Sequence, residues 1–366
     1  MRTIQIDLIA AARPNFMKVA PLFHALAPED WCRVRLVHTG QHYDANMSDS
    51  FFRDFDLPAP DIHLEVGSGS HAEQTGRVMM AYEKVCVEQR PDWVVVVGDV
   101  NSTIACALAA VKLGIRVAHL EAGLRSRDRR MPEEINRLAT DAIVDLLWTP
   151  SVDANENLLA EGVSPDKIEF VGNVMIDAFE LARGRIEDEG TCEKFGLAAG
   201  EFGVVTLHRP SNVDDPQTLR LLVDQLVDVS RSVPLVFAVH PRTQARLAEF
   251  GLSETLEQAP YIRVVEPLGY LAFMNLVTQS RIVITDSGGV QEETTYLGIP
   301  CLTLRENTER PITTSQGSNR LIKPAQLVDA VAEVVASVCI KAEPPELWDG
   351  QAAHRIVADL RRRTGS

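Results

Sequence analysis

The sequence predicts a two-domain α/β protein with parallel sheets, and three observations lead to this prediction. Short apolar runs alternate with amphipathic helical patterns from end to end, which is typical of parallel sheets covered by helices. At 366 residues the chain exceeds the size that one hydrophobic core normally serves. A charged segment over about 176–200, which carries Gly190, Gly196 and Gly200, separates two alternating series.

The apolar runs place the expected strands, and the domain boundary is expected near residue 173. In the first domain, residues 1–173, the predicted strands are Ile4–Ala10, Arg33–His38, Asp92–Val97, Arg116–Leu120, Leu146–Thr149 and Ile168–Val171. In the second domain, residues 174–347, they are Gly203–Leu207, Leu235–Val239, Ile262–Val265, Arg281–Thr285 and Cys301–Leu304. The stretch from Trp348 to Arg363 has a helical pattern.

Charge and cysteine usage exclude several classes of protein. The net charge of −15 argues against a nucleic-acid surface, so an anionic ligand requires a local cationic pocket. The six cysteines are scattered without CxxC spacing, which favours reduced buried thiols and argues against structural zinc. The N-terminus is interpreted as a first strand and not as a signal peptide, and no apolar run is long enough to span a bilayer.

The most informative motif runs from Thr285 to Glu293, where a strand ends in small residues that begin a helix. Backbone N–H groups at Ser287, Gly288 and Gly289 would form an anion site at the helix N-terminus. A carboxylate one turn later, Glu292 or Glu293, could accept hydrogen bonds from ribose hydroxyls. Phosphate plus ribose indicates a nucleotide, although a Gly-Gly turn can also serve packing alone.

Polar residues follow many of the predicted strands. Ligands of open parallel sheets bind outside the carboxyl ends of the strands, so we expect one site, in a cleft between the two domains. The strand-end candidates are Arg13, Gln41, His42, Asp99, Glu121, His208, His240 and Ser287.

The first half supplies three carboxylates for acid–base chemistry, Asp99, Glu121 and Glu133. Helix capping is the alternative for Asp99, and compensation of a helix dipole is the alternative for Glu133. Arg13 and Lys18 lie beside a helix N-terminus, a combination that suits phosphate. A solvated helix start is the alternative for these two cations.

The second half offers a different set. His208 is followed by Arg209, which favours a phosphate contact over a structural role, and His240 repeats the arrangement. Arg310 binds either the ligand or a neighbouring glutamate, and Phe273 either approaches a base or belongs to the core. The sequence has no Ser-His-Asp order, P-loop, GxGxxG or compact metal-ligand spacing, so hydrolase, kinase and dehydrogenase interpretations are weak.

Nine motifs occur in order along nearly the whole chain. They are ARPNFMKVAP, HTGQHYD, VVGDVNST, HLEAGLRS, MPEEINR, TLHRP, HPRT, TDSGGVQEE and ENTERP. Together they resemble the non-hydrolysing UDP-N-acetylglucosamine 2-epimerases. The resemblance implies two Rossmann-like domains in the GT-B architecture, with the C-terminal helix, 348–366, packing back on the first domain. It also implies a cytoplasmic homodimer without cofactor or metal, which interconverts UDP-GlcNAc and UDP-ManNAc for polysaccharide biosynthesis.

The resemblance also implies roles for individual residues. Asp99, Glu121 and Glu133 would transfer protons and stabilise a sugar cation, with the choice of C2 base left open, and His208 would support the departing diphosphate. The ligand-binding residues implied are Arg13, Lys18, Gln41, His42, Arg137, His240, Phe273, Ser287, Gly288, Gly289, Glu293 and Arg310.

Two positions depart from the family pattern. Ala11 stands where the family commonly has Gly, and the methyl group would be costly if that position needed a positive φ. Tyr43-Asp44 follows Gln41-His42 where allosterically activated members have a Gln, so we expect activation by UDP-GlcNAc to be weak or absent.

Three other functions are alternatives to this one. An epimerase of a modified UDP-sugar, of the diacetamido-uronic acid type, is suggested by HTGQHYDANMS. A GT-B glycosyltransferase would share the nucleotide half but would not need three carboxylates in the first domain. A nucleotide-sugar-binding regulator without turnover disagrees with the presence of every proposed acid and base.

Overall fold

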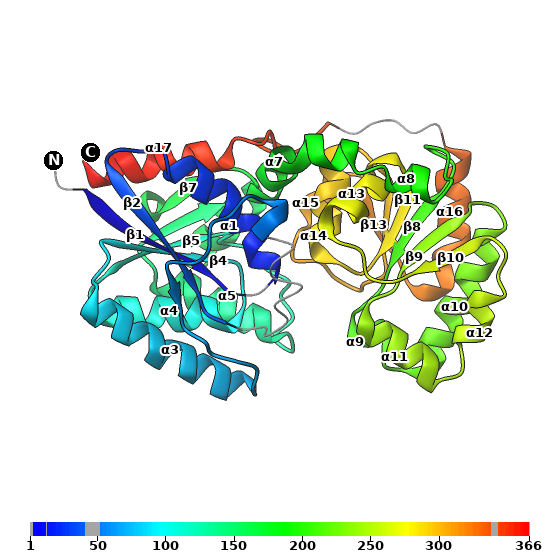
Figure 1. Ribbon diagram of the computed structural model, residues 1–366, viewed down its shortest axis with the longest axis horizontal. Helices are drawn as coiled ribbons and strands as arrows, with labels where there is room; N and C mark the ends of the chain where they lie inside the picture. The colour runs from blue at the N-terminus through cyan, green and yellow to red at the C-terminus, as the bar shows by residue number, and fades with distance from the viewer. Residues whose placement is uncertain (1–2, 12, 41–51, 338–342, 366) are drawn as a thin grey trace. The chain divides into compact units, whose positions relative to one another are not determined.

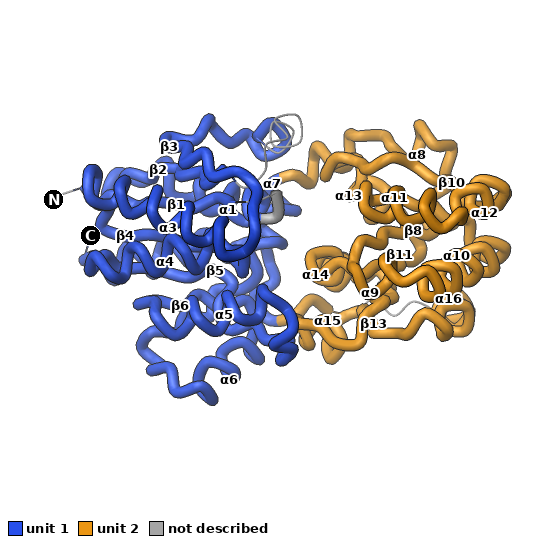
Figure 2. Tube along the Cα trace, turned by 90° about the horizontal axis from the view of Figure 1, so that it is seen from below, with its two compact units in different colours: residues 1–181, 346–366 blue, residues 182–345 orange. Residues whose placement is uncertain are grey.

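The computed structural model describes residues 3–11, 13–40, 52–337 and 343–365 (Figure 1). The chain divides into two compact units, unit 1 with residues 1–181 and 346–366, and unit 2 with residues 182–345 (Figure 2). Each unit contains a parallel sheet covered by helices, so the predicted two-sheet α/β class is confirmed. The division lies inside a long helix, Val174–Asp188, whereas the sequence pattern had placed it near residue 173.

Unit 1 has a seven-stranded sheet in the order β3-β2-β1-β4-β5-β6-β7, and every strand pairing is parallel. Its strands are β1 Ile4–Ala10, β2 Cys32–His38, β3 Ile62–His63, β4 Trp93–Val97, β5 Arg116–Leu120, β6 Leu146–Thr149 and β7 Ile168–Phe170. Its helices are α1 Arg13–Leu26, α3 His71–Glu88, α4 Asn101–Lys112, α5 Pro132–Ile143, α6 Val152–Ala160, the 3₁₀ turn Pro165–Lys167, most of α7 Val174–Asp188 and α17 Ala352–Thr364.

The centre of the unit 1 sheet explains where its polar side chains emerge. The run Trp93–Val97 forms β4 and is buried throughout, as expected for a parallel strand covered on both faces. Helices α3 and α4 pack on one face of the sheet, whereas α1 and α17 pack together on the other (Figure 1). Because β4 pairs with β5, the residues that follow these two strands lie at the same edge of the sheet.

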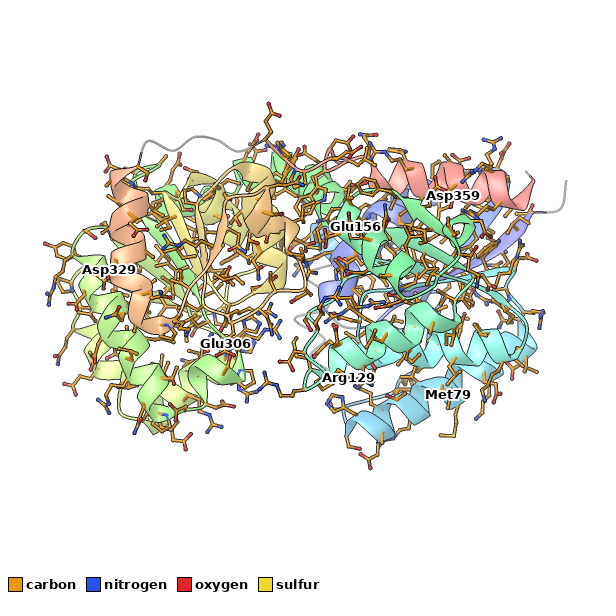
Figure 3. The ribbon with its side chains drawn as sticks, turned by 180° about the vertical axis from the view of Figure 1, so that it is seen from behind. Met79, Arg129, Glu156, Glu306, Asp329 and Asp359 are labelled. Atoms are coloured by element: carbon orange, nitrogen blue, oxygen red, sulfur yellow. The ribbon has the colours of Figure 1, made fainter. Side chains whose placement is uncertain are left out.

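The C-terminal helix α17 belongs to unit 1, and Asp359 marks it in Figure 3. Trp148 Nε1 donates to Asp359 Oδ2 at 2.9 Å, and Asp177 accepts the backbone N–H groups of Ala352 and Ala353. The helix begins at Ala352 and not at Trp348. Trp348 lies in the connection before the helix, where its buried indole donates to the Pro150 carbonyl.

Unit 2 has a six-stranded parallel sheet in the order β10-β9-β8-β11-β12-β13. Its strands are β8 Gly203–Thr206, β9 Leu235–Ala238, β10 Ile262–Val265, β11 Ile282–Thr285, β12 Cys301–Thr303 and β13 Asn319–Leu321. Its helices are α8 Thr191–Lys194, α9 Pro210–Val213, α10 Pro216–Ser230, α11 Pro241–Glu249, α12 Ser253–Glu257, α13 Tyr270–Gln279, α14 Gly288–Leu297, α15 Ile312–Ser315, the 3₁₀ turn Pro324–Gln326 and α16 Leu327–Ala336.

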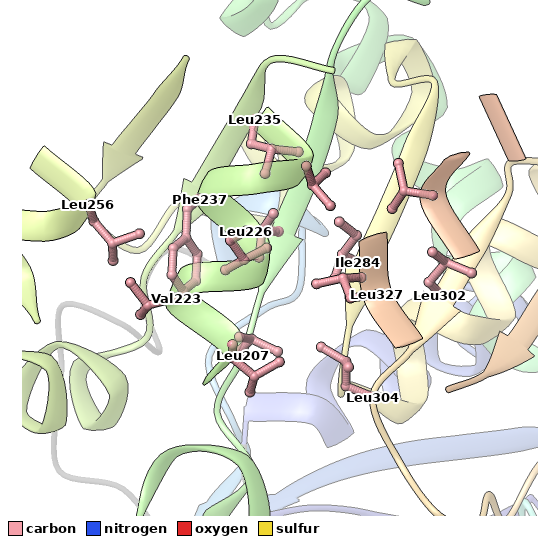
Figure 4. Packing of buried hydrophobic residues seen from close by; sticks show 14 of the residues in the cluster. Leu207, Val223, Leu226, Leu235, Phe237, Leu256, Ile284, Leu302, Leu304 and Leu327 are labelled. Atoms are coloured by element: carbon pink, nitrogen blue, oxygen red, sulfur yellow. The ribbon is translucent and has the colours of Figure 1, made fainter. Parts of the chain in front are cut away.

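The core of unit 2 lies between the sheet and the helices α10 and α16 (Figure 4). Leu226 of α10 and Leu327 of α16 meet Phe237 and Ile284 of the sheet in one buried cluster. Burying each side chain of this size contributes about 2 kcal/mol to the stability of the fold. This core therefore holds the strands of unit 2, and the residues at their ends, in place.

Every strand predicted from the sequence is present, with ends within one residue of the predicted positions. The edge strands β3 and β13 were missed, because two or three residues are too few to show a strand period. Cys32, Cys86, Cys106, Cys192 and Cys301 are buried and free, whereas Cys339 lies outside the described residues. Within the described residues, no helix is both long and apolar enough to cross a membrane.

Candidate active site

Asp99 follows β4 at the carboxyl edge of the unit 1 sheet. The chain turns at Gly98, whose φ of 67° lies in the left-handed region that favours glycine. Asp99 then forms an ion pair with the buried Arg137 of α5. The Asp99 side chain is 31% exposed, so this carboxylate is both held by a cation and accessible to a ligand.

Glu121 follows β5 and has the more unusual backbone. Its φ is 70°, and a non-glycine residue held in the left-handed region costs about 1 kcal/mol or more. The strained turn places the Glu121 carboxylate against Lys18 of α1, and both side chains are buried. Such strain persists only where the surrounding structure enforces it, and it occurs most often at functional sites.

The predicted third carboxylate, Glu133, lies half-buried in the first turn of α5, which begins at Pro132. Among the described residues, Glu133 has no hydrogen bond or ion pair. Its neighbour Glu134 is the buried one: it accepts the N–H groups of Ser126 and Arg127 and pairs with Arg137 at 2.7 Å. Burial raises the pKa of Glu134, but these N–H groups and the guanidinium together lower it below its ordinary value.

The first loop of unit 1 is described only in part. The backbone of Arg13 begins α1, while its side chain, like Gln41 and His42, lies outside the described residues. Lys18, proposed from the sequence as a phosphate ligand, is engaged with Glu121. Ala11 is buried and is not among the described non-glycine residues of positive φ, so the position does not need a glycine backbone.

In unit 2, His208 follows β8 and is held by Asp286, which follows β11. Asp286 is fully buried and accepts from His208 Nδ1 at 2.7 Å, from the N–H groups of His208 and Arg209, and from Asn212 Nδ2. Burial raises the pKa of Asp286, but the His208 ring and the other donors lower it, so the group is a carboxylate. The His208 side chain is 34% exposed, and its ring centroid lies 5.6 Å from that of His240.

The turn from β11 into α14 contains Ser287, Gly288 and Gly289, the predicted anion site. A Cβ at Gly288 would lie 2.7 Å from Glu309 Oε1 and 3.0 Å from Arg310 Nη1, so the glycine lets this ion pair approach the helix N-terminus. The backbone N–H groups of the turn have the orientation that helix N-termini offer to anions.

Arg310 is buried between two carboxylates. Its Nε lies 2.7 Å from Glu292 Oε2, and its Nη1 lies 2.6 Å from Glu309 Oε1. Arg305 also pairs with Glu309, at 2.8 Å. Burial raises the pKa of Glu309, but the two guanidinium groups lower it far below its ordinary value. Of the two alternatives for Arg310, the structure shows the ion pair with neighbouring glutamates.

Glu293, the predicted ribose ligand, is buried one turn into α14. Tyr270 of α13 donates its hydroxyl to Glu293 Oε1 at 2.9 Å. Burial, opposed by this hydrogen bond and assisted by the charge of Glu292, raises the pKa of Glu293 to about 8. Phe273 lies half-buried in the first turn of α13, and His240 is exposed at the N-cap of α11.

Four residues that organise these sites have no role predicted from the sequence: His119 and Asp141 in unit 1, and Asp286 and Tyr270 in unit 2. His119 and Asp286 lie inside quoted motifs, but their partners are 22 and 78 residues away in the chain. No local spacing reveals such pairs. No group of three or more His, Cys, Asp or Glu side chains among the described residues could hold a metal ion.

Comparison with known proteins identifies the family. Residues 24–361 match the family model described as UDP-N-acetylglucosamine 2-epimerase. The chain belongs to this family.

Two similar relatives have names that state different substrates. A UDP-N-acetylglucosamine 2-epimerase of Methanocaldococcus jannaschii is 40% identical over 98% of this chain and 99% of its own length. A UDP-2,3-diacetamido-2,3-dideoxy-D-glucuronate 2-epimerase of Pseudomonas aeruginosa is also 40% identical over 98% of this chain and 99% of its own length.

Solved structures of the family agree with the fold. The crystal structure of the Methanocaldococcus jannaschii epimerase in complex with UDP-GlcNAc and UDP matches with a TM-score of 0.90, covering 98% of this chain and 100% of that one. A Neisseria meningitidis epimerase bound to UDP-GlcNAc matches with a TM-score of 0.89 at 27% identity, over 98% of this chain and 100% of that one. This family member therefore shares the GT-B-like fold of the epimerases.

Proposed function

We propose that this family member reversibly epimerises UDP-GlcNAc to UDP-ManNAc at C2. The observation that carries the proposal is the strained Glu121, held against Lys18 beside the Asp99–Arg137 pair, in a chain of this family. Carboxylates paired with cations at one sheet edge can move protons while the cations stabilise developing negative charge.

The proposed reaction proceeds by elimination and re-addition. The C2–H proton goes to an enzyme base, the C1–O bond to UDP breaks with its electron pair on the diphosphate, and the C1=C2 bond of 2-acetamidoglucal forms. A proton then reaches C2 on the opposite face, while a diphosphate oxygen adds back to C1. Asp99, Glu121 and Glu133 are the proposed proton-transfer groups, and the C2 base is not chosen among them.

The proposed nucleotide site uses unit 2. The helix N-terminus at Ser287, Gly288 and Gly289 would hold a phosphate, and Glu293 would bind the ribose. His208, kept as a partly exposed ring by Asp286, would stabilise the leaving diphosphate. The other ligand-binding residues proposed from the resemblance are Arg13, Lys18, Gln41, His42, Arg137, His240, Phe273 and Arg310.

We also propose that the protein works as a homodimer in the cytoplasm. The family resemblance supports the dimer, and the buried, free cysteines of the described residues suit a reducing compartment. Sedimentation of the purified protein tests the proposed dimer. A mass of 40.3 kDa at micromolar concentration, which is that of one chain, would contradict it.

Proton NMR of the protein with UDP-GlcNAc in deuterium oxide tests the activity. We expect UDP-ManNAc with deuterium at C2, which requires cleavage of the C2–H bond and needs no acceptor. Glu121→Gln is expected to slow the reaction about 1,000-fold, whereas Glu333→Gln, which breaks the exposed pair with Arg320, is the matched control with no effect. A folded protein that binds UDP and gives neither exchange nor product contradicts the proposal.

A modified UDP-sugar is the second candidate substrate, because the Pseudomonas aeruginosa diacetamido-glucuronate epimerase is as similar to this chain as the Methanocaldococcus jannaschii enzyme. The same experiment with the diacetamido-glucuronate substrate separates the two. We expect kcat/KM for UDP-GlcNAc to exceed that for the uronate, and the reverse order would assign the modified sugar.

A further inference from the structure

His119 lies on β5, two residues before Glu121, and is completely buried. Its Nδ1 lies 2.6 Å from Asp141 Oδ1, and its Nε2 lies 2.7 Å from the carbonyl oxygen of Gly98. The ring therefore connects α5 with the turn that carries Asp99, and neither the sequence motifs nor the family comparison assigns it a role.

Both neighbours of the His119 ring are hydrogen-bond acceptors. The Gly98 carbonyl can only accept. Burial raises the pKa of Asp141, but His119 and Arg125 lower it below its ordinary value, so Asp141 is a carboxylate. Each ring nitrogen therefore faces an acceptor, and the hydrogen bond to the Gly98 carbonyl requires a proton on Nε2.

The Asp141 carboxylate is also held by a neighbouring cation. Arg125 Nη1 lies 2.7 Å from Asp141 Oδ2, and Arg125 Nη2 lies 2.7 Å from Glu161 Oε2. Arg125 therefore lies between two carboxylates, Asp141 and Glu161, and it holds the Asp141 carboxylate that the His119 ring meets.

The two hydrogen bonds of His119 fix the turns that bear both carboxylates. A Cβ at Gly98 would lie 3.4 Å from Glu121 Oε2 and from Lys18 Nζ, so rotation of this peptide would disturb both the ion pair and Asp99. Asp141 Oδ2 also accepts the Gly123 N–H at 3.0 Å, which secures the far side of the strained Glu121.

We infer that His119 is a positioning residue, which, through its hydrogen bond to the Gly98 carbonyl, sets the relative placement of Asp99 and Glu121. The inference rests on the proposed epimerase activity. A displacement of about 1 Å in a reacting group costs about 100-fold in rate.

Two substitutions separate the two hydrogen bonds of the ring. In His119→Gln, the amide nitrogen takes the place of Nε2 and keeps the bond to Gly98. In His119→Asn, it takes the place of Nδ1 and keeps only the bond to Asp141. We expect kcat to fall about tenfold or less in the Gln variant and about 100-fold in the Asn variant, with KM changed less than about threefold.

Tyr82→Phe is the matched control, because it removes a buried 2.9 Å hydrogen bond to Asp7 within the same unit. Its kcat is expected to equal that of the wild type, although its melting temperature falls as in the His119 variants. Equal kcat values for the Gln and Asn variants, or a loss in Tyr82→Phe as large as in the Asn variant, overturn the inference.

Asp141→Asn tests the same idea without breaking the geometry. The new amide donates to Nδ1 of the ring, whose Nε2–H still reaches Gly98, so we expect kcat within about threefold of the wild type. Nitrogen-15 NMR should show a proton on Nε2 of His119 in the wild type and in the variant, because that nitrogen faces the Gly98 carbonyl in both. A wild-type ring without a proton on Nε2 overturns the inference. The NMR measurement needs no turnover. Its result therefore tests the positioning role even if the protein fails to epimerise UDP-GlcNAc.

Discussion

Each unit contains a histidine bound through Nδ1 to a buried aspartate, and the two pairs differ in what the second ring nitrogen meets. In unit 1, His119 is fully buried between Asp141 and the Gly98 carbonyl, at 2.6 and 2.7 Å. In unit 2, His208 lies 2.7 Å from Asp286 and keeps a third of its side chain exposed. The same pair therefore serves backbone geometry in unit 1 and leaves a ring available to a ligand in unit 2.

Exposure, and not residue identity, separates these roles. An aspartate at Nδ1 orients the ring in both units. A second acceptor inside the protein engages the remaining ring nitrogen, whereas an open side presents that nitrogen to a substrate. The four predictions that follow test this contrast and the different ways in which the two units hold their carboxylates.

The largest effect is expected from His208→Gln. The variant keeps a polar side chain but loses the ring that Asp286 holds ready, so kcat should fall about 1,000-fold while the melting temperature stays within about 2 °C. His354→Gln, at an exposed position on α17, is the control that should leave both quantities unchanged. Steady-state kinetics and calorimetry measure the two, and a large stability loss without a rate effect would show that His208 has a structural role only.

Asp286→Asn is expected to lower kcat about 100-fold and to reduce stability by about 2 kcal/mol. Asp286 accepts from two backbone N–H groups, Asn212 and the His208 ring, and an amide cannot accept at both ends. Asp214→Asn, which weakens exposed pairs with Arg242 and Arg246, is the control with a small effect. Urea unfolding and initial rates are the measurements, and equal effects of the two substitutions would show that the burial of Asp286 is unimportant.

Glu293→Gln should change the pH dependence of stability. The folded-state pKa of about 8 exceeds the ordinary 4.5, so stability from the protonated carboxyl is complete below about pH 4.5 and is lost as the pH rises through 8. The amide removes this loss and still accepts from Tyr270. At pH 8.5 the variant should therefore be more stable than the wild type by about 2 kcal/mol, and at pH 4.5 it should not be. Urea midpoints that run parallel across this range would contradict the expectation.

Gly288→Ala should destabilise unit 2 by about 1 kcal/mol, because the methyl group would meet Glu309 at 2.7 Å and Arg310 at 3.0 Å. Movement of that ion pair should also weaken UDP binding about tenfold. Gly184→Ala, on α7 with open space around it, is the control and should be neutral or stabilising. Titration calorimetry with UDP and urea unfolding give the two quantities; unchanged binding would remove the turn from the anion site.

Much of the fold could be predicted from the sequence, because parallel strands that are buried on both faces are continuous apolar runs. Trp93–Val97 is one such run, and β4 occupies it. The short edge strand Ile62–His63 could not be predicted, because it is defined by its pairing with β2 and not by a pattern in its own sequence. Strand-end positions of Asp99, Glu121, His208 and the Ser287 turn followed from the same runs.

The hydrogen-bond and ion-pair partners of those residues could not be predicted from the sequence. The motif containing Pro132 indicated two glutamates, but only the structure shows that Glu134 is buried on Arg137 while Glu133 stays half-buried. Arg310 was expected to bind either a ligand or a glutamate, and its packing between Glu292 and Glu309 appears only in three dimensions.

The sequence by itself determined the order of strands and helices, the family, and which polar residues stand at the ends of strands. Those properties depend on local periodicity and on motifs that are continuous in the chain. Tertiary structure alone decided which carboxylate meets which cation, why Glu121 tolerates a φ of 70°, and why one histidine is enclosed while the other is exposed. These outcomes depend on contacts between segments far apart in the chain, and burial, which sets both charge state and exposure, exists only after the segments have packed.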